Sequence, residues 1–472
     1  MSSIPTWNLQ YSHPGTEFPL TALALISGAI PPELRGTLYR NGPGRLERGG
    51  RRVGHWFDGD GAVLAVHFTE TGAEATYRYV QTQEYQQEEE AEKLLFAGYG
   101  MVPPGSLWDR FTKPLKNAAN TSVLPLEDRV LTLWEGGLPY ALDSHTLETQ
   151  GIDHLGSLTS SLSYSAHPKQ DPLTGELFNF GVSFGSKIKL NLYRSDKTGQ
   201  VQQKGHIPLK GVPLIHDFVL AGQYLVFLVS PVRLQILPVL TRLKSFGDAL
   251  QWQPSQATQI LVIDRSTLEL VSRGETDPWF QWHFGNGYVD ESGMINLTFV
   301  GYDNFNQTNQ YLKEVATGKT STPAKGSLRQ IRVDPQTAKV LATEALVEQG
   351  CEFPSVAASV VGQSLQRTYL SIHRPGVDIA TDMFGAIAVY NHQTESLTVA
   401  DFGEHRYPTE PLSVPNEVDP QGGWVIVVVF DSQKNSSEVW IFEAHRLDAE
   451  PVCRLGLPSV VPNGFHGRWQ PA

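Results

Sequence analysis

The chain has 472 residues, of which 40% are hydrophobic and 18% charged, a balance that allows a large buried core and excludes a disordered chain. Its formal net charge is -12, from 37 basic and 49 acidic residues, so we expect no nucleic-acid partner held by phosphate neutralisation. The length is compatible with several ordinary domains or with one large β architecture.

The first ten residues have neither a basic region nor an apolar run and do not resemble a secretory signal. No segment approaches the roughly 20 apolar residues of a membrane-spanning helix. Two cysteines, Cys351 and Cys453, are too few for a multi-bridge framework and fit a reducing compartment. We therefore expect a cytoplasmic protein that can still contact a membrane surface.

In chain order, the first clear element is segment 56–68, where Asp-Gly-Asp-Gly stands between apolar residues and predicts a β-hairpin turn. Segment 81–93 follows and is rich in glutamate, including Glu88 to Glu90. Such a charge run predicts a solvated helix or loop.

The rest of the chain carries a weak repeat of short apolar runs separated by turns. The turns lie between 52 and 70 residues apart, at Asp143, Asp196, Asp264, Asp334, Asn391 and Glu443. A four-stranded propeller blade takes roughly 40–50 residues. With the hairpin at 56–68, this predicts an all-β, seven-bladed propeller that forms a single domain over 1–472, with insertions between blades building a cap of loops and short helices. A multi-sheet sandwich would give a similar pattern.

Within the repeat, residues 238–252 have apolar side chains at near-helical spacing, and Pro238 suits a first helical position. We predict a helix here. Its apolar face would either enter a membrane interface or pack against the propeller as part of the cap.

Four of the 14 histidines lie in apolar or small-residue contexts typical of inner strands: His167, His216, His283 and His466. A propeller brings such distant segments together around its axis, so these four could supply one imidazole each to a metal. Each could equally be a core histidine bonded to the backbone.

Three glutamates, Glu135, Glu352 and Glu410, also lie among apolar residues. Metal-bound imidazoles need an acceptor for their second N–H, and buried carboxylates need partners, so the two sets could explain each other. Glycine fingerprints of nucleotide sites and the Gly-x-Ser-x-Gly motif of hydrolases are absent from the sequence.

The segments Leu-Arg-Gly-Thr-Leu-Tyr-Arg-Asn-Gly-Pro-Gly at 34–44 and His-Trp-Phe-Asp-Gly-Asp-Gly at 55–61 closely resemble the opening of the carotenoid cleavage oxygenases. The likeness continues in order at 134–140, 166–168, 216–218, 352–354, 410–411 and 464–467. It covers almost the whole chain, and the compact cyanobacterial-type apocarotenoid oxygenases are the nearest subgroup.

This resemblance implies a non-haem dioxygenase that holds one Fe(II) per chain under the cap and uses O2 to cleave a conjugated C=C bond of an apocarotenoid to retinal-like aldehydes. It assigns His167, His216, His283 and His466 as iron ligands and places Glu135, Glu352 and Glu410 behind three of them, leaving His167 without a carboxylate. Thr121 matches a threonine beside the open iron position.

The expected substrate is an apolar polyene, and the aromatic residues next to the proposed ligands could line its tunnel: Trp134, Trp282, Phe284 and Phe353. Each could instead be simple core packing. Stilbene-cleaving relatives carry a lysine where Trp134 stands, which favours an apocarotenoid over a phenolic stilbene. A stilbene dioxygenase on the same fold and a non-catalytic propeller that binds other molecules remain alternatives.

Overall fold

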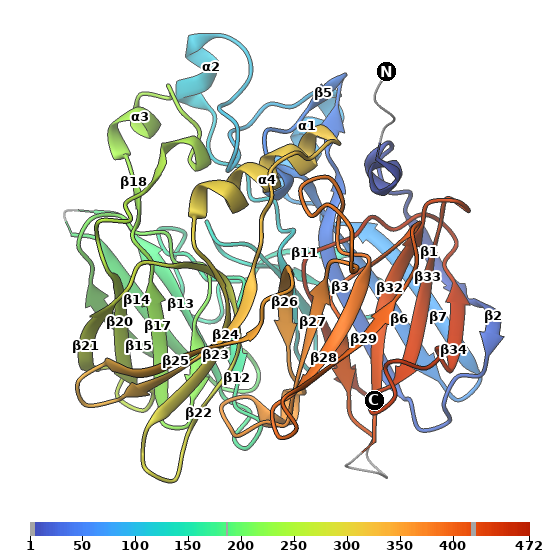
Figure 1. Ribbon diagram of the computed structural model, residues 1–472. Helices are drawn as coiled ribbons and strands as arrows, with labels where there is room; N and C mark the ends of the chain where they lie inside the picture. The colour runs from blue at the N-terminus through green and yellow to red at the C-terminus, as the bar shows by residue number, and fades with distance from the viewer. Residues whose placement is uncertain (1–4, 186, 417–421) are drawn as a thin grey trace.

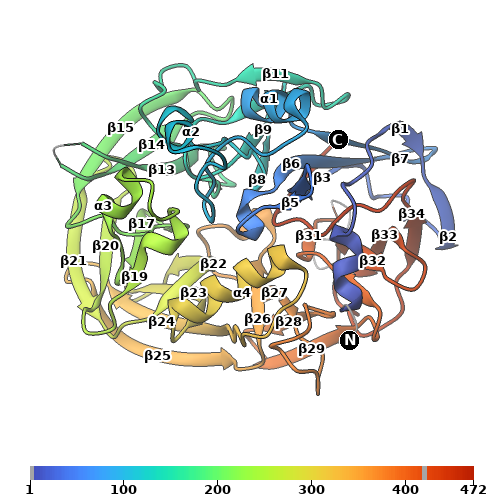
Figure 2. The same ribbon diagram turned by 90° about the horizontal axis from the view of Figure 1, so that it is seen from above.

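We describe a computed structural model of the chain, which covers residues 5–185, 187–416 and 422–472. In this part of the chain the strands form seven sheets of four to six strands and two sheets of two strands. The seven larger sheets stand around a central axis (Figure 2). The fold is a seven-bladed β-propeller, as the repeat predicted.

The first blade joins strands from the two ends of the chain. From the outside inward its strands are β1 (Phe18–Ala22), β7 (Gly72–Tyr79), β6 (Asp60–Thr69), β3 (Gly36–Arg45) and β35 (Gly467–Pro471). β35 pairs antiparallel with β3. The last strand therefore closes the ring by hydrogen-bonding to a strand near the beginning.

Five blades of four strands follow, each written from the axis outward. They are β8 (Ser122–Pro125), β9 (Val130–Leu133), β10 (Tyr140–Leu142) and β11 (Thr149–Ile152); β12 (Lys169–Gln170), β13 (Leu177–Ser183), β14 (Lys189–Ser195) and β15 (Val201–Pro208); β16 (Val219–Ala221), β17 (Tyr224–Val229), β20 (Thr258–Asp264) and β21 (Leu270–Thr276); β22 (Phe280–Val289), β23 (Ile295–Tyr302), β24 (Ser327–Asp334) and β25 (Lys339–Val347); and β26 (Cys351–Ser355), β27 (Arg367–Ile372), β28 (Ala386–Asn391) and β29 (Ser396–Asp401).

The seventh blade takes its outermost strand from the N-terminal region. Its strands are β30 (Arg406–Pro408) and β31 (Leu412–Val414) near the axis, then β32 (Trp424–Asp431), β33 (Ser436–Glu443), β34 (Cys453–Gly456) and β2 (Ala24–Gly28). The small sheets are β4 (Glu47–Arg48) with β5 (Arg51–Arg52), and β18 (Val232–Leu234) with β19 (Leu250–Trp252). Apolar faces of neighbouring blades pack on each other and form the core.

The helices are short and lie on one face of the propeller, as the predicted cap requires (Figure 1). They are α1 (Gln83–Ala91), α2 (Leu107–Thr112), α3 (Ile236–Leu240) and α4 (Phe305–Thr317). The chain also forms the 3-10 turns η1 (Thr6–Tyr11), η2 (Trp56–Asp58), η3 (Gly247–Ala249) and η4 (Ala358–Val360). No helix of the described residues has the length and apolar character needed to cross a bilayer.

The repeated turns lie where the sequence placed them. Five connect the third and fourth strands of the four-stranded blades, and Glu443 ends β33. Their side chains make the turn: Asp264 Oδ1 accepts from the backbone N–H of Ser266 and of Thr267, at 2.9 Å each. The carboxylate replaces backbone partners that a tight turn leaves unpaired, which is why the repeat is visible as aspartate.

Three local predictions were wrong. Segment 56–68 is no hairpin, because η2 occupies its beginning and the Asp-Gly-Asp-Gly residues lead into β6, which pairs with β3 and β7. Segment 238–252 is not one helix: α3 ends at Leu240, Arg242 adopts a left-handed conformation with φ 54°, and β19 follows.

The third error concerns α1, which we predicted as solvated. Glu88 in this helix is fully buried. It accepts from the amine of Lys116 at 2.7 Å, and Lys116 also binds Asp60, which pairs with Arg48 at 2.8 Å. The glutamate run therefore fixes α1 to the propeller through a buried ion network.

Candidate metal centre

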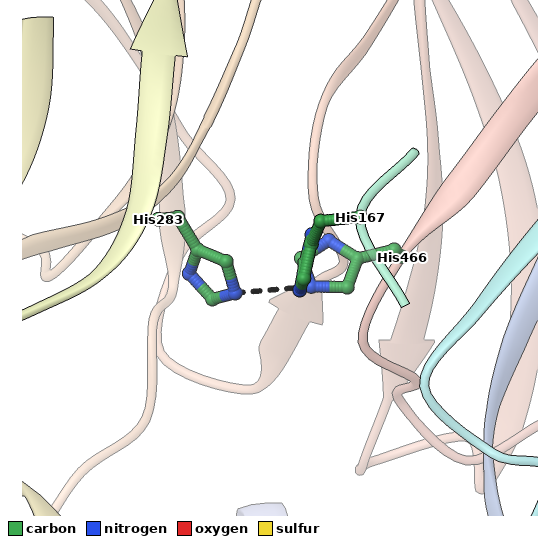
Figure 3. Close-up of side chains that lie close together, drawn as sticks. All are labelled: His167, His283 and His466. Carbon is green, nitrogen blue, oxygen red and sulfur yellow. Dashed lines mark hydrogen bonds between the residues drawn. The ribbon is translucent and has the colours of Figure 1, made fainter. Parts of the chain in front are cut away.

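The four histidines singled out in the sequence meet at the axis. His283 lies in β22, while His167, His216 and His466 lie one to three residues before the inner strands β12, β16 and β35. All four side chains are buried or nearly so. Figure 3 shows three of the rings pointing toward one another from separate segments.

Their Nε2 atoms converge on one point. The Nε2 atoms of His167 and His216 are 3.0 Å apart, those of His216 and His283 3.2 Å, and those of His283 and His466 3.1 Å. The ligand atoms of His167, His283 and His466 all lie within 4.8 Å of one another. Four donor nitrogens thus face a common centre.

A glutamate lies behind each of three rings. His283 donates from Nδ1 to Glu352 at 2.6 Å, His466 donates from Nδ1 to Glu410 at 3.0 Å, and Nδ1 of His216 faces Glu135. Within the described residues no carboxylate oxygen lies within 4 Å of a ring nitrogen of His167. Glu352 and Glu410 are buried, whereas the Glu135 side chain is 31% exposed.

The electrostatics favour neutral rings at three of the four positions. Burial, together with the neighbouring histidines, holds the pKa of His167 and of His216 well below the ordinary value. Burial also lowers the pKa of His466, although Glu410 opposes it. At His283 burial is outweighed by Glu352, which raises the pKa. Glu352 thus stabilises positive charge at this ring, whether a proton or a metal ion supplies it.

The donor set fits a divalent transition metal. When Nδ1–H is donated to a glutamate, the lone pair of a neutral imidazole is on Nε2, and these lone pairs would repel one another without a cation. Two ligand nitrogens at right angles, each about 2.1 Å from a metal, are about 3.0 Å apart. The observed separations of 3.0–3.2 Å match this value.

An apolar cavity adjoins the centre. His216, His283 and His466 form part of its wall together with Thr121, Trp282 and Phe353. The Trp282 ring stands edge-on to His216 at 4.9 Å, and the Phe353 ring stacks on His283 at 5.4 Å. Thr121, Trp282 and Phe353 therefore share one cavity with three of the histidines.

Two predicted substrate residues lie elsewhere. Phe284 packs into the core between blades, against Phe299, because it follows His283 on β22 and points away from the cavity. Trp134 is half-buried, with its ring over the turn at Gly136 and Gly137, and does not line the cavity. Adjacency to a site residue in sequence did not determine side-chain direction.

Other residues of the site gave no signal in the sequence. Tyr302 donates to the second oxygen of Glu352 at 3.0 Å, and the backbone N–H of Phe353 donates to the first at 2.6 Å. Phe353 makes this contact in a left-handed conformation, φ 52°, which costs about 1–3 kcal/mol for a residue with a large side chain. The strained backbone positions both the Glu352 carboxylate and the Phe353 ring.

Comparisons with known proteins agree with this arrangement. Residues 11–471 match the family model described as retinal pigment epithelial membrane protein. The chain is 32% identical to apocarotenoid-15,15'-oxygenase of Synechocystis sp., covering 94% of this chain and 92% of that protein. It is 25% identical to resveratrol cleavage oxygenase 1 of Aspergillus fumigatus, covering 94% and 91%.

Solved structures show the same architecture. The crystal structure of cobalt-substituted Synechocystis apocarotenoid oxygenase superposes with a TM-score of 0.90 at 30% identity, covering 99% of this chain and 98% of that one. The likeness therefore extends over every blade of the propeller and includes the segments that carry the four histidines.

Proposed function

Because the chain belongs to the family of the retinal pigment epithelial membrane protein, to which the carotenoid cleavage oxygenases are related, we propose that it is an iron-dependent dioxygenase of apocarotenoids. It is an oxygenase of this family; the metal and the substrate are the proposal. The observation that carries it is the convergence of four imidazole nitrogens, three of them on rings in the wall of an apolar cavity.

His167, His216, His283 and His466 would hold the iron, with Glu135, Glu352 and Glu410 orienting three rings. Imidazole also suits zinc, copper and nickel, so the choice of iron rests on the family. An iron ion held there supplies the oxygen-activating chemistry, with O2 as co-substrate. The net reaction places one oxygen atom on each carbon of a cleaved C=C bond and gives two carbonyl products.

The chain's own residues position the substrate. The rings of Phe57, Trp282 and Phe353 line the cavity and offer apolar faces to a flat conjugated chain. Thr121 lines the same cavity and hydrogen-bonds to Asn120 at 3.1 Å, which holds its side chain in place. Thr121 limits the space beside the metal, and the aromatic walls keep water from the reacting bond.

Access to a polyene implies contact with a membrane, and the cap offers a surface for it. Leu237, Leu240 and Leu243 are 71%, 68% and 75% exposed, on and directly after α3. On the same face of the molecule, Trp108 and Phe111 of α2 are 77% and 59% exposed (Figure 1). We include in the proposal that this apolar edge rests on a membrane surface.

The test is oxygen-dependent cleavage by the purified protein. After anaerobic reconstitution with Fe(II), an apocarotenal and a resveratrol-type stilbene are supplied with O2, and the products are identified by mass spectrometry. We expect two aldehydes from the apocarotenal, no products after zinc loading, and none from His283→Ala. Turnover of the stilbene alone would replace the substrate assignment, and unchanged turnover by His283→Ala would contradict the metal assignment.

A further inference from the structure

The cavity has a polar end that the reaction described so far does not use. His373, which directly follows β27, lines the same cavity as the metal ligands and is 2% exposed. Its Nδ1 is buried and has no hydrogen-bond partner within the described residues. Tyr311, on α4 and 6% exposed, also lines the cavity, and its phenol oxygen is buried without a partner in that part of the chain.

These two groups share a location. Tyr311 and Met383 belong to one apolar cluster. The His373 ring makes a hydrogen-bond contact with the backbone of Met383 and stands 4.5 Å from the Phe384 ring, so that only its Nδ1 atom is left without a partner among the described residues. A third buried atom without a partner among the described residues, Oγ of Ser371, lies two residues before His373 and borders an adjoining small chamber. Met383 and Phe384 line both spaces.

Aromatic rings separate this polar end from the metal centre. Phe353 stacks on His283 at 5.4 Å, Phe384 stands 6.3 Å from Phe353, and His373 follows at 4.5 Å from Phe384. The cavity therefore runs from three of the metal-directed imidazoles, past two phenyl rings, to the imidazole of His373. Its polarity changes from apolar at the centre to hydrogen-bonding at the far end.

A buried polar group without a partner costs about 1–3 kcal/mol, so two such atoms on side chains that line one cavity indicate a partner that arrives with the bound molecule. Both an imidazole and a phenol can donate to a carbonyl or bond a hydroxyl. Burial lowers the pKa of His373 to about 4, so the ring carries no charge at neutral pH and would not offset a carboxylate.

We propose that His373 and Tyr311 bind the oxygen-bearing terminus, aldehyde or alcohol, of the polyene, and so fix which double bond lies at the metal. This inference rests on the proposed function, and it names the orientation of the substrate: the oxygenated end is bound beside Met383 and the hydrocarbon chain passes Phe384 and Phe353. The two residues are specificity-determining, because they contact the substrate away from the reacting bond.

Binding is measured first, without turnover. Iron-loaded protein is kept anaerobic, and quenching of its tryptophan fluorescence is titrated with three polyenes of equal length ending in an aldehyde, an alcohol or a methyl group. One hydrogen bond corresponds to about a 3- to 10-fold difference in affinity. We expect the aldehyde and alcohol to bind at least that much tighter than the hydrocarbon.

The variants are His373→Leu and Tyr311→Phe, the second of which removes a single oxygen atom and leaves the packing intact. Each should reduce the preference for oxygenated ends by about 3-fold or more while the hydrocarbon affinity stays the same. His392→Leu is the matched control, since His392 is a partly buried histidine on the same blade, bonded to Thr368 outside the cavity. An equal preference in wild type and both variants overturns the inference.

Oxygen is then admitted, and the products are identified by mass spectrometry. We expect the wild type to cleave one bond at a fixed position from the oxygenated end, and His373→Leu to give a mixture of products from neighbouring bonds. If no polyene is cleaved although the anaerobic preference is present, the proposed function is wrong, and the binding role of His373 and Tyr311 is supported. If cleavage occurs with the same products in every variant, the proposed function is supported, and the binding role of His373 and Tyr311 is wrong.

Discussion

His283 and Glu352 form a closer contact than His466 and Glu410, with 2.6 Å against 3.0 Å between Nδ1 and the carboxylate oxygen, and both His283 and Glu352 are buried. Tyr302 and the backbone of Phe353 hold the same carboxylate. The His283 ring is thus fixed from behind by a carboxylate that two further donors hold in place.

Replacing Glu352 by Gln should weaken metal binding by about 10–100-fold, because the amide keeps the shape but loses the charge that favours a cation at His283. Affinity is measured by competition with a chelator. Glu348→Gln, an exposed carboxylate just before the same blade, is the control and should bind metal like the wild type. Equal affinity in both variants would falsify the role of Glu352.

Glu135→Ala should damage metal binding less than Glu352→Ala. The Glu135 side chain is 31% exposed, against 7% for Glu352, so water can take over as the acceptor for His216. The same chelator competition ranks the two variants. A larger loss for Glu135→Ala would show that exposure does not decide the ranking.

Asp58 should give the protein a specific pH dependence. Burial raises its pKa to about 7, against a hydrogen bond from the backbone of Gly100. Its carboxyl in the unfolded chain titrates near 3.8, so the folded state binds the extra proton between about pH 4 and 7, and stability from this group falls as pH rises through that window.

Asp58→Asn removes this dependence. The difference in unfolding free energy between wild type and variant should therefore change by roughly 4 kcal/mol from pH 4 to pH 7. The wild type becomes less stable relative to the variant as pH rises. Denaturant titrations at each pH measure it, and the difference cancels groups common to both proteins. Asp277→Asn, at an exposed position, should show a flat difference; a flat result for Asp58→Asn contradicts the prediction.

Lys116→Met should destabilise the fold by about 3–5 kcal/mol, because it leaves Asp60 and Glu88 buried without their shared partner. Urea unfolding gives the value. Lys434→Met is the control. Lys434 is 53% exposed, and its partner Glu438 keeps Arg454 and Trp440 as donors, so we expect less than about 1 kcal/mol. Similar losses at both positions would mean that burial of the network is not decisive.

The double variant Leu237→Ser with Leu240→Ser should bind lipid vesicles at least about 10-fold more weakly, since two exposed leucines of α3 lose their apolar contribution. Co-sedimentation with vesicles measures the bound fraction. Leu173→Ser changes a leucine that is 79% exposed in the turn between β12 and β13, and should bind like the wild type. Unaltered binding by the double variant would show that α3 does not contact the membrane.

The propeller fold could be predicted from the sequence because side chains that form turns recur along the chain. An aspartate such as Asp264 marks four of the six turns and accepts hydrogen bonds from the backbone of the residues that follow it, so this local signal needs no tertiary information. The metal-directed histidines were identifiable only through the ordered family motifs, since His373 is equally buried and does not belong to the cluster.

Side-chain direction and distant partners could not be predicted. Phe284 and Trp282 flank the same histidine, yet only Trp282 reaches the cavity, because the direction of each side chain depends on the local course of β22. Glu88 looked solvated because its partner Lys116 lies 28 residues away. The apolar spacing at 238–252 was interpreted as helical, but Arg242 breaks the helix.

The closure of the ring by β35 on β3 also sets an order of events. His466 immediately precedes β35, so the fourth imidazole reaches the axis only when this last strand has paired with a strand near the N-terminus. During synthesis the other six blades can form while the donor set is still incomplete. The newly made chain therefore acquires its full affinity for metal in its final folding step. Metal binding at this site indicates that the ring of blades has closed.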